Sequence, residues 1–389
     1  MVNFKVVPTD SIPRVSIQQI LETLTYIQRS NKTNTFDEIR FFLQQRTGRK
    51  TPSSREWMWT VARDILTDLH RLELIKAGVL PRKRSEVERL RDTPVSITKH
   101  GIALAQTYAT DRGRAFDELL QIWLRKHPYF RLFVVRLLGS PLYVPDVTSV
   151  KQIAPEGVSK EVIDTLAERI IQSCLTRLPS AEFSEEKRVR FSQMVNSRVN
   201  ELRKNTEVSK LDTKKIIDLI EDTIVLPSLL SSEELPFDKV TFQHLLQDCE
   251  EFFCATWTSS HPDFQGRIIF STCDFSPDII ADPTLSVISV LHHGQSFAIK
   301  QFSAVFIAAY QKLVGVTAGY ADAYALRAVV SAELRIQPQV FATCLESFLS
   351  KGQMDGFSIY TELPFSPPPP GETYIEVSKR RIGRVKLTS

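Results

Sequence analysis

Two clusters of positively charged side chains carry the clearest chemistry in this sequence, because arginine and lysine bind phosphate through charge-assisted hydrogen bonds. The first cluster consists of Arg82, Lys83, Arg84, Arg89 and Arg91, and Glu86 and Glu88 partly offset its charge. The second cluster has no acidic residue among its members, which are Lys379, Arg380, Arg381, Arg384 and Lys386. The spacing predicts phosphate contacts. The alternative interpretations are a short solvated helix with internal ion pairs for the first cluster and a solubilised edge hairpin for the second.

Motifs of common enzymes are absent from the sequence. It has no GxxxxGK[ST] or GxGxxG phosphate-binding loop, no GxSxG nucleophile turn and no HExxH metal motif. Its five cysteines include no CxxC pair, and Cys249 and Cys254 are expected on opposite faces of one helix, which is poor zinc-ligand spacing. We therefore expect no metal, no cofactor and free thiols in a reducing cytoplasm, and a catalytic role is not favoured.

One weak pattern resembles the metal-dependent nucleases of the restriction-enzyme type. Those enzymes carry an aspartate and then an acidic-x-lysine sequence on a strand, where two carboxylates hold the metal ion that activates water. Here Asp278 is followed by Phe297-Ala298-Ile299-Lys300, so alanine occupies the second acidic position. The resemblance thus implies at most a degenerate site. Its candidate residues are Asp274, Asp278, Asp282, His292 and Lys300.

The first basic cluster lies inside a stretch, 51–105, that reads as helix, strand, basic loop, strand and helix. Ser53 and Glu56 fit a capping box, and apolar residues then recur every three or four positions as far as Leu72. With helices predicted at 15–27 and 36–45, this order resembles the winged-helix fold and predicts a domain over 12–110. In that fold the helix before the wing enters the major groove. The resemblance implies DNA contacts by Ser54, Arg55, Arg63, Lys99 and the first basic cluster.

The rest of the chain predicts two further regions. Region 111–260 is mostly helical, including a helix over 242–256, with a proline-rich linker near 140–157. Region 261–389 is mixed, with β-rich segments at 266–272 and 285–291. It ends in helices at 322–334 and 338–349, a strand at 357–360 and a hairpin that turns at 381–383. This order resembles a second winged helix and implies DNA contacts by the second basic cluster.

Length and composition set outer bounds on the protein. The 389 residues predict two or three domains, and the net charge of +4 is too small for a global field to compel nucleic-acid binding. The longest apolar runs are too short to span a bilayer, and the first ten residues lack the apolar core of a secretory leader. The expected fold class is mainly α with small β-hairpins, a winged-helix unit at each end, a helical middle and a short β-rich insert.

These observations favour a sequence-specific or structure-specific protein that binds double-stranded DNA in the cytoplasm without catalytic activity. Terminal winged helices occur in DNA-binding or accessory subunits of bacterial defence, replication and chromosome-handling complexes, so other protein subunits are expected partners and a membrane is not. Homo-oligomerisation is left open. One alternative is a structural subunit similar to the kleisin bridges of SMC-like complexes, although the β-rich stretch does not fit that layout. The other alternative is the degenerate nuclease.

Overall fold

The computed structural model describes residues 16–46, 52–146, 160–204, 220–275, 290–293, 299–315, 319–369 and 371–388. The protein is mainly helical and has several small sheets of two to four strands. Contacts divide the chain into unit 1, comprising Met1–Leu132, His244–Phe252 and Ser276–Val290, and unit 2, which holds the remaining residues. Within the described ranges, no helix has both the length and the apolar character needed to cross a bilayer.

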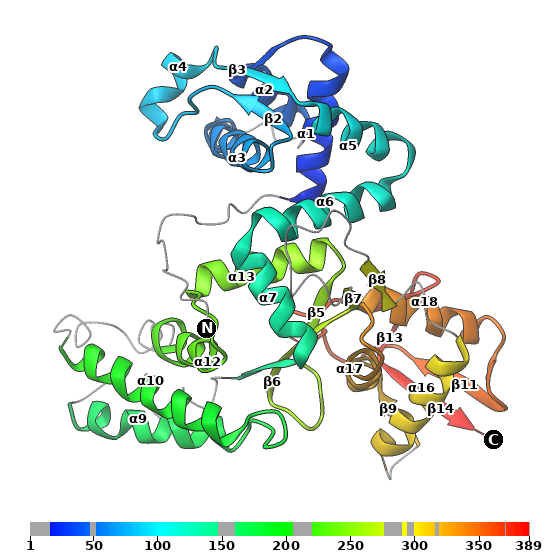
Figure 1. Cartoon of the computed structure of the whole chain (residues 1–389). Coiled ribbons are helices and arrows are strands. Elements are labelled where there is room, and N and C mark those ends of the chain that lie inside the picture. The colour runs from blue at the N-terminus through cyan, green and yellow to red at the C-terminus, as the bar shows by residue number, and fades with distance from the viewer. Residues whose placement is uncertain are drawn as a thin grey trace. The chain divides into compact units, whose positions relative to one another are not determined.

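Unit 1 begins with three helices and a three-stranded antiparallel sheet (Figure 1). In chain order these elements are α1 (Ile17–Ser30), β1 (Asn34–Thr35), α2 (Phe36–Arg46), α3 (Pro52–Arg71), β2 (Ile75–Ala77) and β3 (Pro94–Ile97). The strands lie in the order β1-β3-β2, so the last strand is central. Helix α1 forms because Ile17, Ile20, Leu21 and Leu24 recur on one face, and all four are fully buried. It ends at Asn31, which adopts a left-handed conformation with φ 52°.

Two further helices follow the sheet of unit 1 in the chain. They are α5 (Lys99–Thr110) and α6 (Arg112–Lys126). The Thr98 side chain caps α5 by accepting a 3.1 Å hydrogen bond from the backbone N–H of Gly101. The Asp111 side chain caps α6 by accepting a 3.0 Å hydrogen bond from the backbone N–H of Arg114. Such caps satisfy backbone donors that the first helical turn leaves unpaired, so each fixes where its helix begins.

Gly101 is predicted to tolerate no side chain. A Cβ atom at this position would lie 2.1 Å from the carbonyl oxygen of Leu74 and 2.8 Å from the side chain of Ile97. We expect Gly101→Ala to lower the free energy of unfolding by about 1–3 kcal/mol, since the backbone at Leu74, just before β2, would have to shift. Gly113, in the first turn of α6, has only Asp111 within reach, at 3.6 Å. Gly113→Ala should therefore stabilise by about 0.5–1 kcal/mol, as helix propensity alone predicts. Urea denaturation measures both, and effects of the same sign would contradict these expectations.

A later segment of the chain packs with the helices of unit 1. Helix α13 (Lys239–Glu251) is followed by Phe252, whose ring makes edge-to-face contacts with Trp123 of α6 and with Phe130 of α7 (Pro128–Gly139). The carboxylate of Glu251 accepts a hydrogen bond from the first backbone N–H of α1. Helix α13 ends at Glu251, earlier than the predicted residue 256. Phe253 has φ 55°, which a helix cannot continue, so Cys254 does not share a helix with Cys249.

Unit 2 contains a helical part built on one apolar core. Helices α9 (Lys160–Leu175) and α10 (Glu185–Lys204) pack together, and a π-helical turn, η3 (Glu221–Val225), leads into α12 (Leu226–Ser232). The core that they share also includes Phe264 and Phe270. Phe270 belongs to an antiparallel sheet in the order β4-β6-β5, formed by β4 (Leu142–Pro145), β5 (Ala255–Thr258) and β6 (Gly266–Ser271).

Two sequence predictions can be compared with the structure in this region. The segment Leu142–Pro145 lies in the predicted linker yet forms the edge strand β4, with Pro145 at its last position, where a missing N–H is tolerated. The predicted strand at 266–272 is present as β6, whereas most of 285–291 lies outside the described residues. Its end forms β8 (Val290–His292), which pairs with β7 (Cys273–Phe275).

The C-terminal part of unit 2 repeats the layout of the N-terminal elements. In chain order it consists of α16 (Ile299–Leu313), β9 (Ala321–Asp322), α17 (Ala323–Leu334), α18 (Pro338–Leu349), β10 (Gln353–Met354), β11 (Phe357–Glu362), β12 (Ile375–Val377), β13 (Arg380–Ile382) and β14 (Arg384–Thr388). The main sheet runs β10-β11-β14-β9, so the last strand again lies beside the first, with β11 on its other side and β10 at the far edge. Figure 1 shows these elements in yellow to red. One core, rich in phenylalanine, joins α16, α18 and the sheet.

Candidate nucleic-acid interface

Among the DNA-contacting residues predicted on helix α3, the structure describes the side chain of Arg63 alone. Ser54 and Arg55 lie in α3, but their side chains are outside the described residues. Arg63 forms a 2.6 Å ion pair with the neighbouring Asp64 and lies over the Trp59 ring, 5.2 Å from its centroid. Burial raises the pKa of Asp64, and the adjacent Arg63 guanidinium opposes that shift. The Arg63 side chain therefore already contacts two residues of its own helix in the absence of a ligand.

The first basic cluster occupies the loop between β2 and β3 and is exposed. The loop contains a 3-10 turn, η1 (Arg84–Glu86), and the short helix α4 (Val87–Leu90). A carboxylate oxygen of Glu86 accepts hydrogen bonds from the backbone N–H groups of Arg82, at 2.7 Å, and Lys83, at 3.3 Å. The bond from Arg82 is the main reason that the pKa of Glu86 is held below its ordinary value. Glu86 thus stays ionised and fixes the loop.

Acidic neighbours also offset the later members of this cluster. Arg91 lies 3.9 Å from Glu88 and 3.4 Å from Asp92. These contacts match the alternative interpretation of a solvated helix with internal ion pairs. Lys99 is exposed at the first position of α5, beyond β3. The N-terminal loop therefore presents a mixed surface rather than a purely cationic one.

The second basic cluster lies on a two-stranded hairpin and on the strand that follows it. Strands β12 and β13 pair with Val377 opposite Arg380, so Ser378 and Lys379 form a two-residue turn. Both have positive φ, 48° and 66°, as such hairpin turns require. The hairpin tip is thus at 378–379. The predicted turn at 381–383 is wrong, because these residues form the return strand and its link to β14.

The cations of this second cluster have few acidic partners. Lys379, Arg380, Arg381 and Arg384 are exposed. Arg381 forms a 3.2 Å ion pair with Glu376 on the paired strand and lies 4.1 Å from the centroid of the Tyr374 ring. Within the part of the chain that the structure describes, the other three have no ion pair. This hairpin therefore presents more uncompensated positive charge than the N-terminal loop.

Strand β14 adds two cations to a face that also carries aromatic rings. Arg384 and Lys386 alternate with the buried Val385 and Leu387, so both lie on the outer face of the sheet. Arg384 lies over the Phe365 ring, at 4.7 Å, and Lys386 over the Tyr320 ring, at 5.3 Å.

Alternation in the sequence predicts the two cations of this face but not their aromatic neighbours. Tyr320 and Phe365 come from separate segments, and no local pattern identifies them. The face also carries two acids, because Glu362 of β11 and Asp322 of β9 each stand opposite Arg384 in the register.

The residues of the nuclease-like pattern are only partly described. Asp274 forms an ion pair with Arg335, at 2.9 Å, and lies 3.0 Å from Nε2 of His293, while the His292 ring contacts the carbonyl oxygen of Phe253 at 3.1 Å. Asp278 and Asp282 lie outside the described residues. The strand expected at 297–300 is contradicted at its end, because Ile299 and Lys300 begin helix α16.

Neither the cysteine thiols nor the comparison with known proteins identifies a catalytic residue. All five cysteines are free, and burial raises the pKa of the Cys174 thiol to about 12. Among the described residues, no group of three or more histidine, cysteine or acidic side chains is placed to hold a metal ion. Comparison with known proteins gives no match to a protein-family model, a curated protein or a solved structure.

Proposed function

We propose that the protein binds double-stranded DNA without cutting it, and that each end of the chain is a winged-helix unit. The support for the fold is the order helix, short strand, helix, helix, strand, loop, strand at the N-terminal end. The C-terminal end has the same order with an extra strand, β10, after the third helix and the hairpin β12–β13 within the loop. In both sheets the last of these strands is an inner strand that also pairs with the first. In winged helices the third helix meets the major groove and the loop between the last two strands lies along the backbone.

The observation that carries DNA binding is the cationic hairpin β12–β13 with its continuation into β14. Lys379, Arg380 and Arg384 are exposed and, in the described part of the chain, unpaired with acids. Helix α18 exposes Gln339, Thr343 and Glu346 and no cation, so it suits contacts to bases better than contacts to phosphate. We therefore infer that the C-terminal hairpin supplies most of the phosphate contacts and that the N-terminal loop supplies fewer.

Neutralising the hairpin should weaken duplex binding more than neutralising the N-terminal loop. The triple variant Arg380→Gln/Arg381→Gln/Arg384→Gln is expected to lose roughly tenfold or more in affinity, and the slope of log affinity against log salt should fall by about one for each phosphate group that is no longer neutralised. Fluorescence anisotropy with a short duplex, between about 50 and 200 mM salt, measures both quantities.

Two matched variants complete that experiment. Arg82→Gln/Lys83→Gln/Arg84→Gln removes three cations from the N-terminal loop, and Arg169→Gln/Arg203→Gln/Lys204→Gln removes three exposed cations from α9 and α10. The loop variant should show a smaller loss and the α9–α10 variant almost none. Absence of duplex binding by the unmodified protein at low salt, or equal losses in all three variants, would refute the proposed interface.

A structural subunit of a larger complex is the second candidate function, and one observation favours it. Leu363 and Phe365, in the segment after β11, are 68% and 79% exposed beside the cations of β14. Exposed apolar side chains of this size often mark a protein partner. This candidate predicts a partner that co-purifies from the native host after nuclease treatment and dissociates in Leu363→Ser/Phe365→Ser. Purification as a lone protein under those conditions would count against it.

A further inference from the structure

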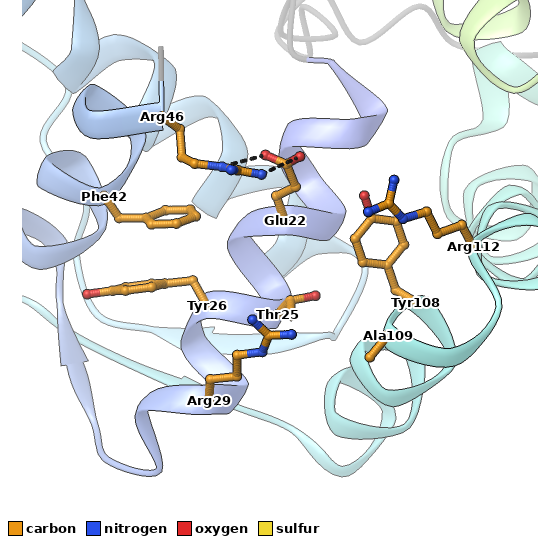
Figure 2. Close-up of a pocket in the computed structure, with 9 residues that line it drawn as sticks. All are labelled: Glu22, Thr25, Tyr26, Arg29, Phe42, Arg46, Tyr108, Ala109 and Arg112. Carbon is orange, nitrogen blue, oxygen red and sulfur yellow. Dashed lines mark hydrogen bonds and ion pairs between the residues drawn. The ribbon is translucent and has the colours of Figure 1, made fainter. Parts of the chain in front are cut away.

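A pocket of about 340 Å³ in unit 1 gathers three arginine side chains from three helices. Arg29 belongs to α1, Arg46 to the end of α2 and Arg112 to the start of α6. Figure 2 shows the Arg46 guanidinium lying against Glu22, and Arg112 beside Tyr108. Binding sites for small ligands commonly begin near this volume, so the pocket has room for a small organic anion but not for a large cofactor.

The charge in this pocket is unbalanced. Glu22 is the one acidic residue among the side chains that line it, which leaves a formal charge of +2 from the three arginines. Both oxygens of Glu22 are occupied: Arg46 contacts them at 2.9 and 3.3 Å, and Gln18 donates a further hydrogen bond. Glu22 therefore orients Arg46 and has little capacity left for the other two guanidiniums.

The two remaining arginines have no acidic partner in the described ranges. Arg112 lies over the Tyr108 ring, 5.6 Å from its centroid. Arg29 is exposed in the last turn of α1 and makes no ion pair within the described part of the chain. Guanidiniums that converge without a counter-charge repel one another, and a bound anion relieves that repulsion while accepting paired N–H bonds.

An aromatic wall lies beside these cations. Figure 2 shows the rings of Tyr26 and Phe42 stacked on each other. Their centroids are 4.3 Å apart and the interplanar angle is 12°. Tyr26 is on α1, between Glu22 and Arg29, and Phe42 is on α2, four residues before Arg46, so the two helices that form the wall also carry two of the three arginines. A flat ring attached to an anionic group fits this combination better than an inorganic ion, because the ring gains apolar contact that the ion cannot make.

We propose that this pocket binds a phosphate monoester carried on a nucleotide. A phosphate monoester bears about −1.5 to −2 charges at neutral pH, which matches the charge excess, and its oxygens accept the paired donors of arginine. The nucleotide is either a free nucleoside monophosphate or the 5′-terminal nucleotide of a DNA strand. Binding at this site does not depend on the basic hairpin of unit 2, so it is separable from duplex binding.

Calorimetric titration of the full chain distinguishes the two sources. The probes are a nucleoside monophosphate, the corresponding nucleoside, inorganic phosphate, and a short oligonucleotide with either a 5′-phosphate or a 5′-hydroxyl. Tight binding of the monophosphate, but not of the nucleoside, identifies a free nucleotide. Preference for the 5′-phosphorylated oligonucleotide, without binding of the monophosphate, identifies a strand end. Either result supports the site.

Variants locate the binding to the pocket. Arg29→Gln and Arg112→Gln should each weaken binding about tenfold or more, as expected for removal of a hydrogen bond to a charged group. Arg114→Gln, two residues farther along α6 and outside the pocket lining, is the matched control and should bind like the unmodified protein. The triple hairpin variant should also keep phosphate recognition, which separates this test from that of duplex binding.

Three results would overturn the assignment. They are no binding of any phosphorylated probe, inorganic phosphate binding as tightly as the nucleotide, or unchanged affinity in both Arg29→Gln and Arg112→Gln.

Discussion

Asp68→Asn is expected to raise the free energy of unfolding by a few kcal/mol at pH 8 and to leave it almost unchanged near pH 4. Asp68 lies on α3 with its side chain fully buried, and within the described structure neither carboxylate oxygen has a hydrogen-bond partner. The nearest cation, Arg71, is 4.0 Å from one of them. Burial raises the pKa of Asp68 from 3.8 to about 8, with Arg71 lowering it and Asp64 raising it.

The sign of this pH dependence follows from proton uptake. Between pH 3.8 and about 8 the folded protein holds a proton on Asp68 that the unfolded chain releases, so stability falls as pH rises. A shift of this size corresponds to about 6 kcal/mol, since each pKa unit is worth about 1.4 kcal/mol. Asparagine keeps the shape of the protonated carboxyl group and cannot ionise, so Asp68→Asn should remove the loss of stability that the unmodified protein shows as pH rises.

A neighbouring carboxyl group should show the same behaviour and be coupled to Asp68. Asp248, on α13, is buried and belongs to the same unit. Burial raises its pKa well above the ordinary value, and the charge of Asp68 raises it further. In a double-mutant cycle with Asp248→Asn, the two gains should therefore sum to more than the gain of the double variant.

His127, in the same unit, lowers the stability of the fold at acidic pH. It is buried, stacked on Trp123 with ring centroids 4.5 Å apart, and burial lowers its pKa from 6.5 to about 3, with a smaller effect from Arg71. Between those values the unfolded chain binds a proton that the folded chain does not, so stability falls as pH falls. The effects of His127 and Asp68 oppose each other between pH 3.8 and 6.5, and above 6.5 the loss from Asp68 remains.

Urea denaturation across this pH range provides the measurement. The control is Asp92→Asn, at a side chain that is 80% exposed, which should change stability little at any pH. A stability difference between Asp68→Asn and the unmodified protein that stays constant from pH 4 to 8 would contradict the raised pKa.

Local patterns predicted most helices of this protein because each depends on neighbouring residues. Helix α18 occupies the predicted 338–349, and α17 starts one residue after the prediction. The strand β4 could not be predicted in this way, since its partner β6 lies more than a hundred residues away and the prolines just before it and at its end, Pro141 and Pro145, are typical of a linker. The end of α13 was also missed, because Phe252 and Phe253 continue a helical apolar pattern although Phe253 adopts a positive φ.

The candidate sites also differ in whether neighbouring residues in the sequence are enough to predict them. Continuous runs such as Lys379–Arg381 identify basic surfaces from the sequence, because their members are adjacent in the chain. The arginine pocket brings Arg29, Arg46 and Arg112 together only through the packing of three helices. Likewise, the acids that offset Arg63 and Arg91 are visible as neighbours in the sequence, but whether they form ion pairs depends on helix geometry.

Arg327→Met is expected to destabilise unit 2 by about 3–5 kcal/mol, the usual cost of leaving one partner of a buried ion pair unpaired. Arg327, on α17, contacts Glu372 at 2.6 Å, and the two side chains are only 7% and 6% exposed. The other oxygen of Glu372 accepts hydrogen bonds from the backbone N–H of Ser259, at 2.8 Å, and from the Ser260 hydroxyl, also at 2.8 Å. The pair therefore links α17, the end of β5 and the segment before β12.

Two variants test whether charge, rather than poorer packing, causes this effect. Arg327→Met/Glu372→Gln removes both charges but keeps an acceptor for Ser259, so it should recover most of the stability. Arg381→Met breaks an exposed pair with Glu376, whose side chains are 54% and 55% exposed, and should cost less than about 1 kcal/mol. Equal costs for Arg327→Met and Arg381→Met would show that burial of the pair does not matter.

The pH dependence of Arg327→Met gives an independent check on that cause. Burial alone would raise the pKa of Glu372, but the Ser259 backbone N–H and the Arg327 guanidinium together hold it below its ordinary 4.5. In the unmodified protein this group stabilises the fold above pH 4.5, and that contribution is lost as pH falls through the lower folded pKa. Without Arg327, burial should raise the pKa of Glu372 above 4.5, so the variant loses stability as pH rises. The difference between the two proteins should therefore be larger at pH 7 than near pH 4, and a difference that does not change with pH would assign the loss to packing instead.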